Sequence, residues 1–77
     1  MKPESLIALA ERLKTDARRL RKHGQEGFAA DLRYAAFVCR RLAAMAVADE
    51  LKGERDATRR RVLVAEISDL WAGARPR

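Results

Sequence analysis

The sequence predicts an all-α protein, and three observations lead to this prediction. Ala and Arg are abundant, while the helix-breaking residues are scarce, with four glycines and two prolines in 77 residues. Apolar residues recur at spacings of three and four over long stretches, as they do in helices with one buried face. Gly24 and Gly53 interrupt these stretches. A chain of this length is expected to form one helical domain, residues 1–77.

The first helix is predicted over residues 3–23. Pro3 suits a first turn because its missing N–H would have no partner there, and Glu4 complements the positive end of the helix dipole. Gly24 follows a basic last turn and suits the left-handed position after a helix. The apolar stripe between these ends consists of Leu6, Leu9, Leu13, Ala17 and Leu20.

The second helix is predicted over residues 25–52, and it should return beside the first because the connection at Gly24 is short. Residues that face each other in such an antiparallel hairpin have numbers that sum to about 48, which pairs Leu20 with Phe28 and Leu6 with Leu42. Every facing pair is then apolar. The stripe of the second helix consists of Phe28, Leu32, Ala35, Cys39, Leu42 and Ala46.

A third helix is predicted over residues 57–72, after the polar connection "KGERDATRRR". Either Asp56 or Thr58 is a suitable cap for its first turn. Its apolar face consists of Leu63, Ile67, Leu70 and Ala74, with Val64 and Trp71 beside them. The tail, residues 73–77, is expected to fray.

The second helix has more apolar surface than one neighbour needs. A second stripe consists of Ala30, Tyr34, Phe37, Arg41, Ala44, Met45 and Ala48. Leaving large apolar side chains in water forfeits about 1.5–3 kcal/mol each, and exposed patches of this kind mark interaction sites. The third helix, a second copy of the chain and a different protein are three possible covers, and they are compatible. We expect a homodimeric helical bundle, because so short a chain has a small core of its own.

Five residues are candidates for partner binding: Tyr34, Phe37, Arg41, Met45 and Trp71. Tyr, Trp and Arg dominate binding hot spots, although aromatic residues at helical spacing also suit a core. An arginine in the middle of an apolar stripe must either extend its charge to water or pair with a carboxylate. We therefore expect an Asp or Glu from another helix or another chain beside Arg41.

The sequence indicates no catalytic residue, cofactor or metal site. Cys39 is the only cysteine, so it has no partner for an internal disulfide. Cys39 and the single histidine, His23, are too few ligands for a structural zinc ion. Cys39 is expected to be a buried apolar residue, and His23 a cap at a helix end. No run of about 18 apolar residues is free of charge, and the N-terminus lacks a cleavage signal. We expect a cytoplasmic protein that neither crosses a membrane nor catalyses a reaction.

The net charge of +6 is concentrated locally. The candidate basic patch consists of Arg12, Lys14, Arg18, Arg19, Arg21 and Lys22, together with Arg59, Arg60 and Arg61. Duplicated in a dimer, these residues suit the phosphates of RNA or DNA, or they attract an acidic protein. Glu66 and Asp69 on the third helix would repel phosphate, and no aromatic residue lies among the basic ones to stack on bases. Protein binding is therefore the first hypothesis, and a dimeric nucleic-acid-binding regulator is the alternative.

The segments "LIALAERL" and "KHGQEGFAADL" lie within the first half of the chain. Together with the chain length, they resemble the short helical-hairpin host-takeover proteins of temperate phages of high-GC bacteria. The resemblance implies a small non-enzymatic protein that binds a host protein, such as a transcription regulator, and inhibits or redirects it. It assigns no functional residue.

Overall fold

The computed structural model describes residues 2–73, which form three helices and no strand. Helix α1 spans Pro3–Lys22, α2 spans Glu26–Gly53 and α3 spans Ala57–Gly73. The predicted all-α fold is thus confirmed, and each helix begins and ends within one residue of the expected position. Gly73 ends α3, and the rest of the tail that was expected to fray lies outside the described residues.

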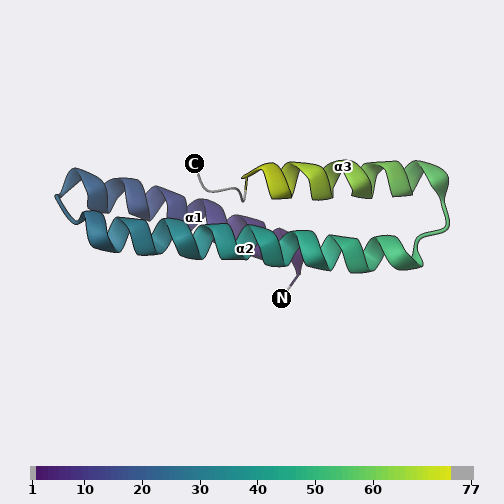
Figure 1. The fold of residues 1–77 in the computed structure, drawn as a ribbon, viewed down its shortest axis with the longest axis horizontal. Coiled ribbons are helices and arrows are strands. Elements are labelled where there is room, and N and C mark those ends of the chain that lie inside the picture. The colour runs from purple at the N-terminus through teal and green to yellow at the C-terminus, as the bar shows by residue number, and fades with distance from the viewer. Residues whose placement is uncertain (1, 74–77) are drawn as a thin grey trace.

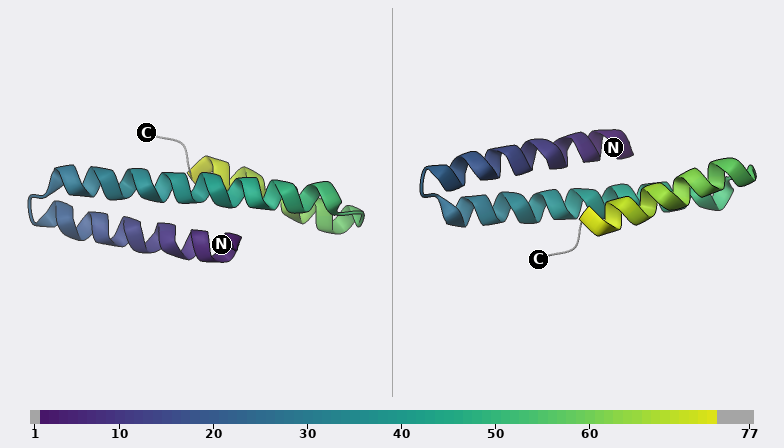
Figure 2. Two further views of the ribbon diagram at one scale, coloured as in Figure 1. Left: turned by 90° about the horizontal axis from the view of Figure 1, so that it is seen from below. Right: turned by 90° about the horizontal axis from the view of Figure 1, so that it is seen from above.

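Helix α2 is the central element of the fold (Figure 1). Helices α1 and α3 both pack on α2, and within residues 2–73 they do not pack on each other. The two further views in Figure 2 show α1 and α3 on different sides of α2. The described backbone is long and thin, with extents of 49, 24 and 13 Å. A large part of every helix surface therefore remains accessible to water.

The chain reverses direction at Gly24, so that α2 runs back beside α1 (Figure 1). Gly24 has a φ of +76°, a left-handed conformation that glycine adopts without a steric penalty. The N–H of Gln25 donates to the carbonyl of Leu20 at 2.9 Å, and the N–H of Gly24 donates to that of Arg21 at 3.1 Å. These bonds satisfy the last carbonyls of α1. The role predicted for Gly24 is confirmed.

Alanines form the contact between α1 and α2. Each of them is at most 2% exposed, and they recur every seven residues: Ala10 and Ala17 on α1, and Ala29, Ala36 and Ala43 on α2. Two of the facing pairs expected from the sequence, Leu20 with Phe28 and Leu6 with Leu42, are wrong, because Phe28 is 64% exposed and Leu42 is 46% exposed. Alanine side chains let two helix backbones approach closely, and the bulkier residues then lie at the margins of the contact.

All three helices contribute to one small core where α1 and α3 both overlap α2. Its buried members are Leu6, Ala43, Ala44, Val47, Leu63 and Leu70. Ala44 belongs to the second apolar stripe, so α3 covers part of that stripe. Cys39 is half-buried and packs against this core, in keeping with the apolar role expected for it.

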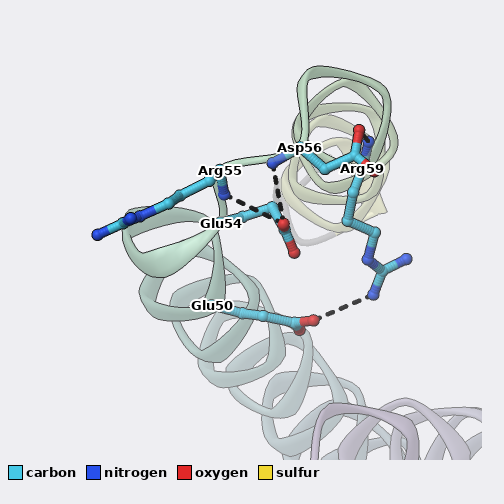
Figure 3. Close-up of polar contacts among 5 residues, drawn as sticks. All are labelled: Glu50, Glu54, Arg55, Asp56 and Arg59. Carbon is cyan, nitrogen blue, oxygen red and sulfur yellow. Dashed lines mark hydrogen bonds and ion pairs between the residues drawn. The ribbon is translucent and has the colours of Figure 1, made fainter.

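Carboxylates organise the connection between α2 and α3 (Figure 3). An oxygen of Glu54 accepts hydrogen bonds from the backbone N–H groups of Arg55 and Asp56, both at 3.1 Å. An oxygen of Asp56 accepts one from the N–H of Thr58 at 2.9 Å and one from that of Arg59 at 3.4 Å. Of the two caps considered from the sequence, Asp56 is the one that caps α3.

Replacing Asp56 with alanine should therefore lower the free energy of unfolding by about 1 kcal/mol, because two N–H groups lose their acceptor. Asp56→Asn should retain most of the stability, since an amide oxygen accepts the same bonds. Urea denaturation followed by circular dichroism measures both. Asp69→Ala, near the opposite end of α3, is the matched control. The capping role is wrong if Asp56→Ala and Asp69→Ala unfold at the same urea concentration as the wild type.

Candidate interaction surface

An arginine lies between two aromatic rings where α2 meets α3. The guanidinium carbon of Arg41 lies 5.4 Å from the ring centroid of Phe37, one turn earlier on α2. It also lies 5.4 Å from the ring of Trp71 on α3. Tyr34 extends the row, with its ring stacked on Phe37 at 6.0 Å and 26° between the planes. A guanidinium is favourable in this position because its charge faces two electron-rich rings.

The sequence-predicted binding residues thus form one continuous group, which we call the aromatic surface: Tyr34, Phe37, Arg41, Met45 and Trp71. Met45 lies one turn after Arg41 on the same helix. Tyr34 is 69% exposed, Met45 57% and Trp71 38%, while Phe37 is half-buried. Helix α3 covers Ala44 but leaves these larger side chains in contact with water. The surface belongs to two helices, so neither helix alone presents it.

The described helices of this chain provide no carboxylate that forms the ion pair expected for Arg41. Among residues 2–73, Arg41 takes part in no ion pair, and its guanidinium carbon lies over the two rings instead. A neighbour, Arg40, forms the ion pair, with Glu11 of α1 at 3.5 Å. Stacking on rings does not satisfy the five N–H donors of a guanidinium, which still need water or an external acceptor.

Two further large apolar residues of α2 are exposed where the sequence predicted a buried contact. Phe28 and Leu42 were assigned to the contact with α1, but both are largely exposed on α2. The signal that would have placed them correctly is the seven-residue spacing of the alanines on both helices. The alanines with this spacing occupy the contact between α1 and α2, so the larger side chains lie outside it.

The nine basic residues predicted as one patch do not lie together. The six on α1 are all exposed, and most are near the turn that joins α1 to α2. The three on α3 lie near the opposite end of the molecule (Figure 1). Two of these three bind other parts of the chain. The structure therefore presents one basic group on α1 and a separate group at the start of α3.

Arg59 and Arg60 attach the start of α3 to the end of α2. Arg59 donates to Glu50 of α2 at 3.0 Å (Figure 3), and this hydrogen bond is the main cause that raises the pKa of Arg59. Arg60 donates to the carbonyl of Glu54 at 2.9 Å and to that of Leu51 at 3.5 Å. These contacts explain why arginines occur at the positive end of a helix, where their charge is otherwise unfavourable.

Within residues 2–73 there is no group of three or more potential metal ligands, and no helix is long and apolar enough to cross a membrane. An open hollow between α1 and α3 is lined partly by Glu4, Glu50, Glu66 and Asp69. Arg40 and Arg59 lie among these carboxylates. The hollow is a mixed-charge region in which Glu50 already pairs with Arg59.

Comparisons with protein-family models, with curated proteins and with solved structures find no match to this chain.

Proposed function

We propose that this protein is a small non-enzymatic interaction module that binds another protein through its aromatic surface. The observation that supports this most directly is the position of Arg41 between Phe37 and Trp71 on an exposed surface made by two helices. Tyr, Trp and Arg are the residue types that contribute most to protein–protein binding energy. Here the three types are adjacent, and apolar Met45 is next to them.

The surface is also held in place before a partner binds. Leu63 and Leu70 anchor α3 on α2, with exposed fractions of 0% and 5%. Because Leu70 directly precedes Trp71, this packing fixes the position of the indole. Less conformational entropy is then lost on binding, which favours affinity.

The chemistry of the surface defines the partner it suits. A partner needs apolar side chains for the rings and Met45, and a carboxylate for Arg41, which forms no ion pair among residues 2–73. The exposed basic residues of α1 would attract an acidic protein from a distance. The phage resemblance adds a target class, a host protein such as a transcription regulator, which the module would inhibit or modulate in the cytoplasm. Self-association as a homodimer is compatible with this proposal, because a second copy of the chain is one protein that the aromatic surface could bind.

Capture from a cell lysate tests this proposal. The wild type should retain a protein partner after nuclease treatment, and Trp71→Ala should lose most of it because the indole and its stacking on Arg41 are removed. Val64→Ala is the matched control, since Val64 is 54% exposed on the same helix. Recovery is measured by quantitative mass spectrometry. The proposal fails if nuclease releases the partner, or if both variants recover as much of it as the wild type.

A nucleic-acid-binding regulator is the second candidate, favoured by the exposed basic residues of α1. Binding to duplex DNA or hairpin RNA should then weaken steeply between about 50 and 200 mM salt, because phosphate contacts release counterions. Replacing Arg18 and Arg21 with alanine should weaken binding further. If binding at moderate salt is undetectable, or if it is unchanged in this double variant, the basic group serves another purpose.

A further inference from the structure

The outward side of α2 has the spacing of a helix-pairing seam. Asp31, Tyr34, Val38, Arg41 and Met45 follow one another at alternating steps of three and four residues. This is the repeat with which helices pair in coiled coils. Val38 is half-buried and the other four are exposed. Helices α1 and α3 lie on two different sides of α2 (Figure 2), and the exposure of these four residues shows that the two helices leave them accessible.

We propose that a second copy of the chain covers this seam, with the two α2 helices antiparallel about a two-fold axis. In this arrangement Asp31 of each copy pairs with Arg41 of the other. The inference rests on the proposed function, because it names a second copy as one protein that the aromatic surface binds. It supplies the carboxylate that Arg41 lacks among residues 2–73.

The register follows from the two charged residues. In an antiparallel two-fold pair, the numbers of facing residues have a constant sum, and pairing Asp31 with Arg41 sets it at 72. Tyr34 then faces the partner's Val38. Met45 faces the partner's Gly27, where the absent side chain leaves room for methionine. In this register the seam pairs large side chains with smaller residues, and an acidic side chain with a basic one.

The same register covers the two exposed residues beside the seam. Phe28 and Leu42 lie on one flank of the seam. Their residue numbers sum to 70, close to the sum of 72 that facing residues have in this register. Each Phe28 therefore lies next to the partner's Leu42. Every large hydrophobic residue that is exposed on α2, namely Phe28, Tyr34, Leu42 and Met45, thereby gains an apolar neighbour or a glycine.

Registers shifted by seven residues leave Arg41 without a carboxylate at the position that faces it directly. Shifting the helices by seven residues in one direction places Arg41 opposite the partner's Val38, and shifting them in the other direction moves it beyond the start of the partner's α2. A parallel two-fold pair places Arg41 beside its own copy, and like charges repel. A charged residue at one position of a seam commonly fixes register in this way.

Charge exchange tests the pair. Arg41→Asp and Asp31→Arg should each weaken the dimer by about tenfold or more, because each places like charges together. The variant with both substitutions restores opposite charges, so its dissociation constant should return toward that of the wild type. Sedimentation equilibrium measures the constants, and circular dichroism checks that every variant keeps its helix content. Asp49→Arg, exposed on α2 outside the seam, is the matched control and should remain dimeric.

Three results would overturn the inference: a monomeric wild type at micromolar concentration, a double variant no more dimeric than the single variants, or a control that dissociates equally. The lysate capture with Trp71→Ala reports separately on the proposed function. If the wild type is monomeric but still captures a partner through Trp71, only the proposed pairing with a second copy is rejected. A dimer restored by charge exchange supports the inference even where no other protein is captured.

Discussion

Replacing Leu63 with alanine is expected to lower the free energy of unfolding by about 2–5 kcal/mol, which is a large share of the stability of a small domain. Leu63 has an exposed fraction of 0% and is the largest fully buried side chain in residues 2–73. Helix α3 packs only on α2, so a cavity at Leu63 weakens a contact that has no substitute. Trp71 should also become mobile, because its helix loses an anchor.

Urea denaturation at one fixed protein concentration measures this effect, since self-association makes stability depend on concentration. Circular dichroism reports all three helices, and the fluorescence of the single tryptophan reports α3. Val62→Ala and Val64→Ala are matched controls on the same helix, with 44% and 54% exposure. They should change stability by less than about 0.5 kcal/mol. A Leu63→Ala protein as stable as these controls would contradict the described core.

Replacing Ala36 with leucine is expected to lower the free energy of unfolding by about 1–3 kcal/mol or more. Ala36 is 2% exposed in the alanine contact between α1 and α2, and a larger side chain there must push the two helices apart. Leucine itself is a good helix former, so the loss would come from packing and not from helix propensity.

Ala30→Leu is the matched control, because Ala30 is exposed on the same helix. It should leave stability within about 0.5 kcal/mol of the wild type. Equal stability of the Ala36→Leu and Ala30→Leu proteins would mean that α1 and α2 do not meet at the alanines. A comparison of denaturation midpoints at one protein concentration decides between the two outcomes.

Local features of the fold were predictable from the sequence. The conformation of Gly24 and the cap at Asp56 depend on residues within one turn of each, and so do the helix ends. The same holds for the three helices, whose apolar periodicity is present in the chain itself. Such features require no knowledge of which helix packs where.

Features that depend on packing were not predictable in the same way. The bulkiest apolar stripe of each helix was expected at the contact between α1 and α2, whereas the side chains buried there at 2% exposure or less are alanines. The environment of Arg41 depends on where α3 places Trp71, and no local sequence pattern predicts that position. Arg59 and Arg60 appeared free to bind nucleic acid, but the return of α3 toward α2 brings them to Glu50 and to backbone carbonyls.

The central claim is that α2 has more apolar surface than α1 and α3 cover, and that a second copy of the chain covers it. Sedimentation equilibrium of the wild type at low micromolar concentration tests this most directly. We predict a mass of twice 8.7 kDa. A single species of 8.7 kDa across the concentration range, with Tyr34 and Met45 still in water, would contradict it.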